Sequence, residues 1–356
     1  MYKKTTPLFL VCETPLHAGS GDSLGVVDLP IQRERHTSFP KIEGSSLKGA
    51  IRQALEGQNP ECTSNASEYQ KALELAFGPE NAGDKGYAGA MGFTDARLLL
   101  FPVKSMKGVF AWVTCPKVLQ QFHRDMLLTE FKDRDEIVYS LAVEALTTPA
   151  KCTEGVSGSC NLFLKYDSNK IVLEEYTFEI ENKESPELMH LLKFLAEQLF
   201  PVPRGEGEPD SYAFWRSKLM TDVVVLPDED FTDFVNLSTE VITRTKIDNE
   251  TGTVAKGQLF TEEYLPSESV MYSLVLASPI FKKNDADKGI FNMSYDSPCF
   301  TDCENEESKV MEFFRKALPK VIQIGGNATL GKGLVRTIML SFGAVTENGG
   351  AEDDGE

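Results

Sequence analysis

Two kinds of side chain near the N-terminus could perform chemistry. The string Gly-Asp-Ser-Leu-Gly has the G-x-S-x-G pattern that can present a nucleophilic serine, here Ser23, on a strained turn. Asp28 follows in the segment GVVDLPIQ, ahead of Arg33, Arg35 and His36. Because those side chains could bring an RNA phosphate close, Asp28 could hold a divalent cation or accept a proton from a 2′-hydroxyl. The alternatives without chemistry are a flexible glycine loop and a carboxylate that only shapes a turn.

The serine reading lacks its partners. A catalytic serine of this type needs a histidine and an acid later in the chain, yet no histidine occurs after His190. Esterases with the GDSL string place Asp-x-x-His near the chain end, whereas the nearest match here is Glu187-Leu-Met-His190 in a helical pattern. The residues after Ser23 are β-branched and include a proline, so no helix is expected to follow the turn. A flexible loop is favoured, and Ser23-dependent hydrolysis of small esters would be the mark of the esterase alternative.

A second glycine-rich string, GGNATLGKG, begins at Gly325. From Gly326 to Lys332 it has the spacing of a P-loop, but Gly333 stands where a Ser or Thr would hold magnesium. A helix is also expected before this loop and a strand after it, which inverts the P-loop order. Backbone N–H groups around Gly325, Gly326 and Asn327 can still converge on a phosphate, with Lys332 adding charge. A glycine-rich turn before an edge strand is an equally good interpretation.

The string GSSLKGAIRQALEG predicts a helix that begins with a Ser45 or Ser46 cap and ends near Gly57. Lys48 and Arg52 are four residues apart and therefore share one face of this helix. Such a pair is ordinarily a solvated surface. A helix start with free N–H groups is also an anion site, so the pair could flank a bound phosphate.

The loop AGSGDSLG, which contains Gly19 and Ser20, is a further backbone-rich segment. Together with the helix start and the GGNATLGKG loop, it suggests a polyanion laid across one surface. The net charge of −18 argues against a general nucleic-acid binder, because phosphate affinity is built from Lys and Arg. However, residues 32–52 carry five basic residues against two acidic ones, so one face could still bind RNA.

The order of expected elements indicates an α+β fold, in which strands and helices alternate in a split pattern. Strands are expected at 7–13, 91–103, 108–114, 161–164, 171–180, 222–226, 241–247, 257–263, 270–277 and 333–342. Helices are expected at 44–57, 67–77, 116–128, 186–199 and 308–321. We expect one domain over 1–346 with insertions near 57–87 and 150–265, and a disordered acidic tail at 347–356.

The seven cysteines form no dense framework, which suits a reducing cytoplasm. Cys152 and Cys160, and likewise Cys299 and Cys303, have no nearby histidine and do not have zinc-site spacing, so buried thiols are expected. No apolar run reaches the length of a membrane span.

Two long segments of the chain resemble the RAMP superfamily: LHAGSGDSLGVVDLPIQRERHTSFPKIEGSSLKGAIR and GGNATLGKGLVR. More narrowly they resemble the backbone subunits of the type III-B CRISPR effector, the Cmr complex. FTDARLLLFPVKS and RTKIDNETGTVAKGQLFTEEYLP fit the same family, and the resemblance extends from Thr6 to Phe342. One departure is Ser38, which stands where the family pattern HTGFP has glycine.

The resemblance implies an RRM-like (ferredoxin-like) core with large insertions, one of them a thumb β-hairpin. It implies copies that stack into a filament on a guide RNA, bind target RNA and other subunits of the complex, and do not bind a membrane. It implies a metal-dependent endoribonuclease, with Asp28 catalytic and able to hold Mg²⁺, and with the 241–263 hairpin near the RNA duplex. The RNA-binding residues that it implies, together with those argued above, are His17, Gly19, Ser20, Arg33, Arg35, His36, Ser45, Ser46, Lys48, Arg52, Gly325, Gly326, Asn327 and Lys332. His36 could also act as an acid or a base, although a structural hydrogen bond is the more ordinary role for such a histidine. The rival hypothesis is a non-catalytic RNA-binding filament subunit in which Asp28 only shapes its loop.

Overall fold

The computed structural model of the chain describes residues 2–22, 25–58, 62–80, 86–130, 155–156, 160–166, 169–180, 186–203 and 208–340. Ser23, whose role as a nucleophile the sequence disfavoured, Cys152 and the acidic tail at 347–356 therefore lie outside the described residues, as do parts of both expected insertions. Within the described ranges, no helix has both the length and the apolar character needed to cross a membrane.

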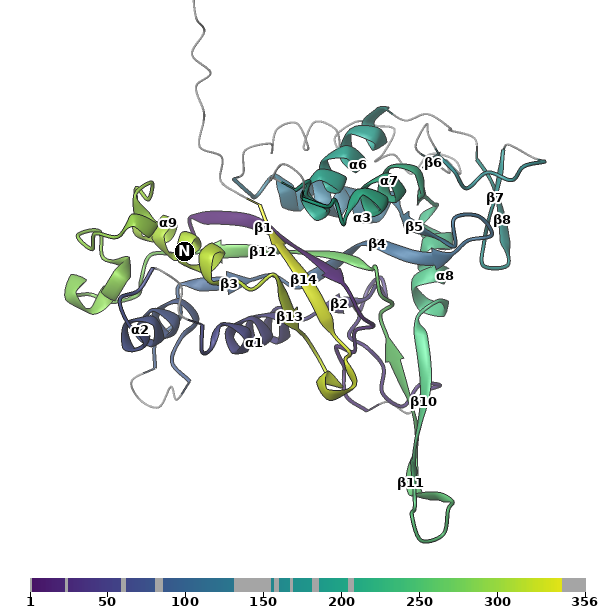
Figure 1. Ribbon diagram of the computed structural model, residues 1–356, viewed down its shortest axis with the longest axis horizontal. Helices are drawn as coiled ribbons and strands as arrows, with labels where there is room; N and C mark the ends of the chain where they lie inside the picture. The colour runs from purple at the N-terminus through teal and green to yellow at the C-terminus, as the bar shows by residue number, and fades with distance from the viewer. Residues whose placement is uncertain are drawn as a thin grey trace, which may run out of the picture.

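Strands and helices alternate along the chain, as expected for an α+β protein (Figure 1). The strands are β1 (Lys4–Cys12), β2 (Lys41–Ile42), β3 (Met91–Phe93), β4 (Ala96–Lys104), β5 (Phe110–Thr114), β6 (Gly155–Val156), β7 (Lys170–Leu173), β8 (Tyr176–Glu179), β9 (Val223–Val225), β10 (Glu240–Ile247), β11 (Val254–Tyr264), β12 (Val270–Ala277), β13 (Val321–Gln323) and β14 (Leu334–Met339). The helices are α1 (Gly44–Leu55), α2 (Ala66–Phe77), α3 (Pro116–Met126), α6 (Pro186–Leu199), α7 (Ala213–Thr221), α8 (Asp228–Leu237) and α9 (Glu306–Ala317). Short 3₁₀ segments are η1 (Asp285–Phe291), η2 (Pro298–Phe300) and η3 (Ala328–Leu330).

One large mixed sheet organises the described chain. Its strands run in the order β13-β14-β1-β12-β4-β5-β9-β6, with β2 beside β4 and β3 beside β12. The pairs around β1 are antiparallel, whereas β5 and β9 are parallel. In chain order, the central strands and the helices that pack on the sheet read β1, α1, β4, β12, α9 and β14, with the fourth strand beside the first and the third beside the second.

The core follows from apolar patterning. Strand β1 lies between β14 and β12 and is apolar on both faces from Leu8 to Cys12, as a central strand must be when both faces are covered. On α1, Leu47, Ile51 and Leu55 recur at helical spacing, and all three are buried. Because β1 and α1 are held in the core, the loops at their ends are held in position as well.

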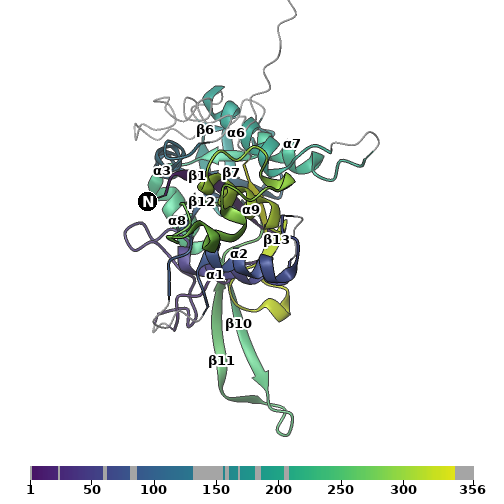
Figure 2. The ribbon, with the colours of Figure 1, turned by 90° about the vertical axis from the view of Figure 1, so that its left-hand side faces the viewer.

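A long two-stranded hairpin, β10–β11, projects from the body (Figures 1 and 2). Its strands pair antiparallel from Glu240 with Tyr264 out to Ile247 with Val254. Both views place the turn between β13 and β14 beside the base of this hairpin. The hairpin base therefore meets a loop that is distant in sequence.

Several sequence predictions about elements are wrong or incomplete. Residues 161–164 form no strand, and the expected strand at 171–180 is the β7–β8 hairpin, which turns at Glu174 with a φ of 50°. The expected 91–103 strand is divided into β3 and β4. Strand β14 is not an edge strand, because β13, which was not predicted, pairs outside it. The periodic pattern also missed the short helices α7 and α8.

The cysteine prediction is confirmed in part. Cys12, Cys62, Cys115 and Cys299 are buried free thiols, while Cys160 and Cys303 are half-buried. Burial raises the pKa of Cys12, assisted by the charges of Glu268 and Glu13, to about 12. The thiol is therefore protonated at neutral pH and behaves as a small apolar side chain.

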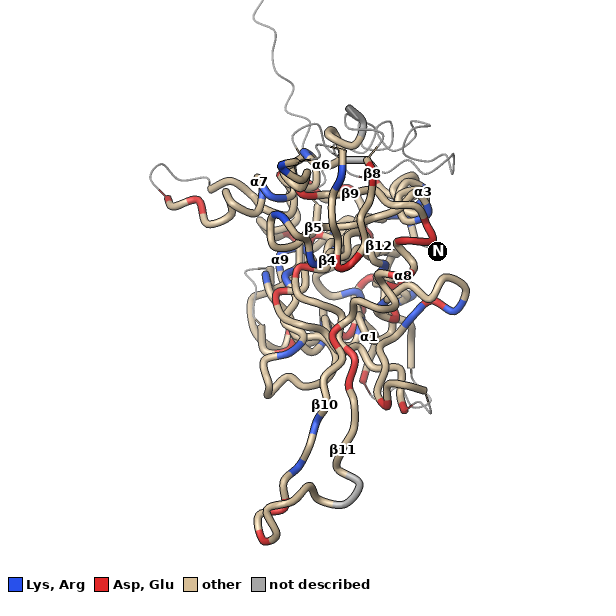
Figure 3. The backbone as a smooth tube through the Cα atoms, turned by 90° about the vertical axis from the view of Figure 1, so that its right-hand side faces the viewer, with Lys and Arg blue, Asp and Glu red and all other residues tan. Residues whose placement is uncertain are grey.

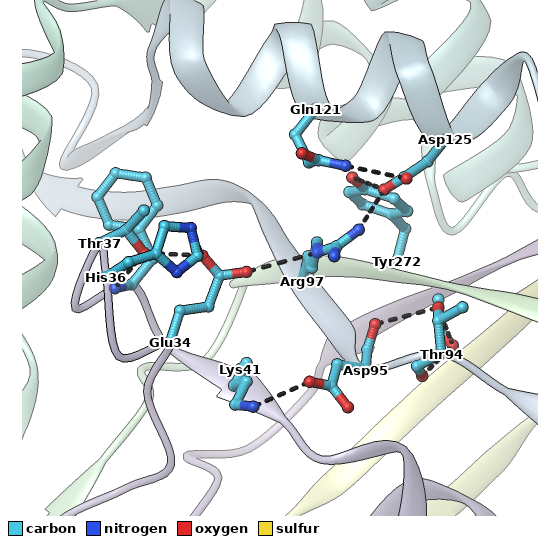
Figure 4. Close-up of polar contacts among 12 residues, drawn as sticks. Glu34, His36, Thr37, Lys41, Thr94, Asp95, Arg97, Gln121, Asp125 and Tyr272 are labelled. Carbon is cyan, nitrogen blue, oxygen red and sulfur yellow. Dashed lines mark hydrogen bonds and ion pairs between the residues drawn. The ribbon is translucent and has the colours of Figure 1, made fainter.

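The segment that follows Asp28 is tied to the sheet by a polar network (Figure 4). Arg97 on β4 lies with Nε 3.4 Å from Oε1 of Glu34 and donates from Nη1 to Oδ2 of Asp125 at 2.7 Å. The buried hydroxyl of Tyr272 donates to the same Asp125 oxygen at 2.8 Å. These contacts hold the 33–40 turn against β4 and α3.

Ser38 lies at the turn where the family pattern has glycine, and its φ is 63°. Left-handed backbone costs a non-glycine residue about 1–2 kcal/mol, partly offset by the extra unfolded-state entropy of glycine. We expect Ser38→Gly to stabilise the protein by about 0.5–1 kcal/mol. Urea unfolding of the two proteins measures this difference, and an unchanged or lower midpoint would contradict it.

Candidate RNA-cleavage site

Asp28 lies on a loop that runs along β11, at the base of the projecting hairpin. The backbone N–H of Leu29 donates to the oxygen of Thr261 at 3.0 Å, and the N–H of Glu263 donates back to the oxygen of Leu29 at 3.0 Å. Leu29 forms a parallel bridge with Glu262. The loop therefore pairs with β11 through one β-bridge, and backbone hydrogen bonds hold it in place.

The carboxylate of Asp28 is exposed but oriented. Its Oδ2 accepts hydrogen bonds from the backbone N–H of Thr261 at 2.8 Å and from the Thr261 hydroxyl at 2.9 Å. In return, the N–H of Asp28 donates to Oγ1 of Thr261 at 3.0 Å. The pKa of Asp28 lies below its ordinary value because these two donors, first the backbone N–H and then the hydroxyl, favour the ionised form.

Asp28 shares an open surface depression with Asp22, Leu29 and Phe260. Two carboxylates beside an aromatic ring could receive a cation or a nucleotide. Among the described residues, no group of three or more His, Cys, Asp or Glu side chains is placed to hold a metal ion. Any cation here would therefore need further oxygen ligands from water or from its substrate.

Arg33 points into the protein. Its Nη2 lies 2.5 Å from Oε1 of Glu263, and Nη1 donates to the backbone oxygens of Ser38 and Val235. The same Nη1 donates to Oδ1 of Asn236 at 3.0 Å. The guanidinium thus joins the loop after Asp28 to α8 and to β11.

Glu263 completes this internal network. Its side chain is 6% exposed, and its Oε2 accepts the backbone N–H of Ile31 at 3.0 Å. The hydroxyl of Thr239 donates to Oε1 at 2.8 Å. The side chains of Thr261 and Glu263, two residues apart on β11, therefore hold the loop on either side of Leu29.

Glu262, the residue between them, belongs to a second hydrogen-bonded network. Of the residues in this network, only Asn327 was predicted from the sequence as a binding residue. Arg244 and Tyr264 donate to Oε2 of Glu262 at 2.9 Å and 2.7 Å. Asn327 donates to Oε1 of Glu262 at 3.1 Å and to the Tyr264 hydroxyl at 2.9 Å. Burial opposes ionisation of Glu262, but these donors outweigh it and leave its pKa below the ordinary value. Only the resemblance of this hairpin to the family signalled the site in the sequence.

The backbone trace in Figure 3 shows Lys and Arg positions on β10 and Asp and Glu positions on β11 near the base of the hairpin. Arg244 and Glu262 form the ion pair between these two strands. The charges of this pair therefore neutralise each other, and the two side chains are fixed before any ligand binds.

His17 lies beside this network. Its Nδ1 is 2.7 Å from the backbone oxygen of Glu263, and because a carbonyl only accepts, Nδ1 carries the hydrogen and Nε2 is the acceptor of the neutral ring. The imidazole packs on Tyr264 with ring centroids 5.5 Å apart. Lys332 lies over the same tyrosine, 4.9 Å from its centroid. Two loops at opposite ends of the sequence thus meet on one aromatic ring.

The two glycine-rich loops are in contact. The N–H of Gly326 donates to the oxygen of His17 at 2.9 Å, and Gly325 has a φ of 79°. A Cβ on Gly325 would lie 2.1 Å from the His17 oxygen, whereas a Cβ on Gly331, with a φ of 70°, would meet nothing within 4 Å. The approach of the two loops at this point needs glycine.

This pair gives a stability prediction. Gly331→Ala should cost about 1 kcal/mol through its left-handed backbone alone, and Gly325→Ala should cost at least about twice that because the loops must also separate. Thermal unfolding of both variants and the native protein measures the difference. If both variants lost the same free energy of unfolding, the close approach of the two loops would contribute nothing to stability.

The remaining predicted RNA-binding residues occupy three places. Gly19 forms an antiparallel β-bridge with Ile31, and the Ser20 hydroxyl donates to the backbone oxygen of Pro30 at 3.1 Å. Arg35 and His36 are exposed, and His36 lies 3.8 Å from Glu34. All four lie on the loop segments around Asp28.

At the start of α1, Ser45 is exposed and Ser46 accepts a hydrogen bond from Gln32 at 3.3 Å. The predicted serine cap is wrong: Glu43 is the N-cap residue, and its own side chain makes no capping hydrogen bond. The carboxylate of Asp95 accepts the N–H of Gly44 at 2.8 Å, so an anion already lies at this helix end.

Lys48 and Arg52 share a face as predicted, but that face meets protein. Nζ of Lys48 donates to the oxygen of Met91 at 2.9 Å, and Arg52 donates to the oxygen of Gly78 at 2.6 Å. Burial, followed by the charge of Arg52, holds the pKa of Lys48 below its ordinary value. A nearby phosphate would oppose this shift and raise the pKa of Lys48, because a negative charge favours the ammonium form.

Comparison with known proteins matches the RAMP superfamily model to residues 9–336. The chain is 36% identical over 337 residues to the CRISPR system Cmr endoribonuclease Cmr4 of Pyrococcus furiosus, covering 95% of each. It is 28% identical over 344 residues to the CMR subunit Cmr4 of Saccharolobus solfataricus, covering 94% of this chain and 96% of that protein. The fold resembles the crystal structure of oligomeric Cmr4 from Pyrococcus furiosus, with a TM-score of 0.60 and 28% identity over 96% of this chain and 99% of that chain. It also resembles a chain of the type III-B Cmr-beta complex bound to cognate target RNA, with a TM-score of 0.63 and 21% identity over 95% and 98%.

Proposed function

This chain belongs to the RAMP superfamily, and from that premise we propose that it is a guide-RNA-binding backbone subunit of a type III-B CRISPR effector that cleaves complementary target RNA. The observation that carries the proposal is the exposed Asp28 carboxylate, ionised and oriented by Thr261 at the base of the β10–β11 hairpin. The relative from Pyrococcus furiosus is named as an endoribonuclease, which supports the cleavage activity.

The fold of this subunit is an RRM-like core with a thumb. The order β1, α1, β4, β12, α9, β14, with antiparallel neighbours, supports a ferredoxin-like core. The thumb is the β10–β11 hairpin, whose tip lies far from the sheet in Figure 1. We propose that residues 1–346 form one domain, with insertions near 57–87 and 150–265.

The RNA path follows the loops that converge at the hairpin base and the α1 face. For Arg33 we assign a structural role, because its guanidinium is paired with the nearly buried Glu263 carboxylate and donates to three further oxygens, whereas Lys48 and Arg52 each donate to one backbone oxygen. The residues we assign to RNA are His17, Gly19, Ser20, Arg35, His36, Ser45, Ser46, Lys48, Arg52, Gly325, Gly326, Asn327 and Lys332. These groups offer backbone amides, hydroxyls and cations, which suit phosphate contacts and leave sequence reading to base pairing with the guide.

The reaction proposed is attack of a target 2′-hydroxyl oxygen on the adjacent phosphorus atom. The new P–O bond gives a 2′,3′-cyclic phosphate as the P–O5′ bond breaks, the 2′-hydroxyl loses its proton to solvent and the leaving 5′-oxygen takes up a proton from solvent. A nucleotide displaced from the duplex by the thumb could reach the in-line geometry that an A-form helix forbids. The lowered pKa makes Asp28 a weak proton acceptor at neutral pH, so its main task is to orient the hydroxyl and to hold positive charge near the phosphate.

The donor set of the depression fits a magnesium ion. Asp28 and Asp22 would hold it, since Mg²⁺ binds through one or two carboxylates together with substrate phosphate oxygens. When bound, the ion would neutralise charge that develops on the phosphate. The protein's own part is to keep Asp28 ionised and fixed.

The partners follow from the same proposal. They are a guide RNA, a target RNA, further copies of the chain and other subunits of the complex, and no membrane is expected. One of the similar structures is an oligomer and another is a complex bound to cognate target RNA, which supports these assignments. We expect the complex to act in the cytoplasm, where the free thiols stay reduced.

The test is single-turnover cleavage of end-labelled complementary RNA by guide-loaded complexes, with Mg²⁺ or with excess EDTA. The proposal predicts cuts at regular intervals that need the metal and disappear in Asp28→Ala complexes with unchanged RNA binding. Cuts that persist in Asp28→Ala would favour the non-catalytic filament subunit. Hydrolysis of a small ester without RNA would instead support the esterase alternative.

A further inference from the structure

The orientation of Asp28 depends on one residue. Within the described residues, the hydrogen bonds that its carboxylate accepts both come from Thr261, and both reach the same oxygen, Oδ2. The structure records no hydrogen bond to Oδ1 from the described chain. One carboxylate oxygen is thus fixed and the other is available to a ligand.

Threonine suits this position because its hydroxyl has two functions at once. Oγ1 donates to Oδ2 of Asp28 at 2.9 Å and accepts the Asp28 backbone N–H at 3.0 Å. Valine has nearly the same shape but can do neither, so the hydroxyl is separable from the packing of the side chain. The backbone N–H of Thr261 would remain in any variant.

Thr261 also has a rigid support. It lies within β11, paired with Thr243 of β10, and three residues before the buried Tyr264. Two residues further along β11, Glu263 is held by its ion pair with Arg33. The Asp28 carboxylate is therefore attached to the hairpin and moves with it.

We propose that Thr261 is a positioning residue: its hydroxyl holds the Asp28 carboxylate in the orientation that RNA cleavage requires and so couples the hairpin to the reacting group. This inference rests on the proposed function of Asp28. Thr261 does not itself touch the reacting atoms. Its loss should therefore slow the chemical step without altering RNA affinity or the positions of the cuts.

The experiment compares guide-loaded complexes carrying Thr261→Val, Thr261→Ser and Thr232→Val. Thr232 is a half-buried threonine of α8 whose hydroxyl donates to the oxygen of Asp228 at 2.6 Å, so it controls for loss of a hydrogen-bonded hydroxyl elsewhere. At saturating complex, Thr261→Val should lower the single-turnover rate about 10- to 100-fold, since small misplacements of a reacting group have effects of that size. Thr261→Ser and Thr232→Val should cut at close to the native rate, and all complexes should bind target RNA equally.

Three results would overturn the inference. Native-rate cleavage by Thr261→Val would mean that the backbone N–H alone suffices. Equal slowing by Thr261→Ser would assign the effect to the lost methyl group. Weakened RNA binding in proportion to the rate would make Thr261 an RNA contact.

A parallel Asp28→Asn complex separates this inference from the proposed function. If Asp28→Asn is inactive while Thr261→Val is unaffected, only the positioning role fails. If Asp28→Asn cuts at the native rate, the catalytic assignment fails, and the role of Thr261 fails with it.

Discussion

Guide-loaded complexes carrying Asp28→Asn are expected to cleave complementary RNA about 10²–10⁴ times more slowly than native complexes. Asparagine keeps a side-chain oxygen that can accept the two hydrogen bonds from Thr261, so the loop should retain its path along β11. What disappears is the negative charge that, under the proposed function, would hold a cation and orient the attacking hydroxyl. The loss should therefore fall on the chemical step.

The measurement is the single-turnover rate at saturating complex, beside the affinity for the same RNA. Asp233→Asn on α8 removes an exposed carboxylate away from the hairpin base and should leave rate and affinity unchanged. A native rate for Asp28→Asn would contradict the assignment. An equal loss of affinity and rate would show that Asp28 binds RNA instead of acting in the reaction.

Replacing Arg33 with alanine is expected to lower the free energy of unfolding by about 3 kcal/mol, near the lower end for breaking a buried ion pair. The lower end applies because the Arg33 side chain is 20% exposed, while that of Glu263 is only 6% exposed. Among the described residues, the variant leaves the interior Glu263 carboxylate with only the Thr239 hydroxyl and the Ile31 N–H as donors. It also removes the links from this loop to α8.

Urea unfolding of the isolated subunit measures this effect, with Arg35→Ala as the matched control. Arg35 is exposed and two residues away, so its removal should change stability by no more than about 0.5 kcal/mol. If Arg33→Ala unfolds like the native protein but weakens RNA binding, Arg33 contacts RNA as the sequence first suggested.

The sequence predicted what depends on neighbouring residues. The apolar run of β1, the amphipathic stripe of α1 and the glycine-rich turn at Gly325 are patterns within a few positions, and each lies where it was expected. Predictions failed where the pattern of neighbouring residues favoured one structure but contacts with other segments of the chain favoured another. The 161–164 run is apolar enough for a strand but forms none, and Ser45 and Ser46 lie within the first turn of a helix whose N-cap is Glu43.

By itself the sequence determined the α+β class and the family resemblance, and it singled out Asp28 as a candidate in its loop. The tertiary structure decided which groups act on that carboxylate. Thr261 is 233 residues away from Asp28, and Glu263 is 230 residues away from Arg33. No local pattern encodes these contacts, because they arise from the register of β11 against a loop and against β10. The same register places Glu262 and Tyr264 on Asn327, so the sequence identified the loops and only the fold joined them into a site.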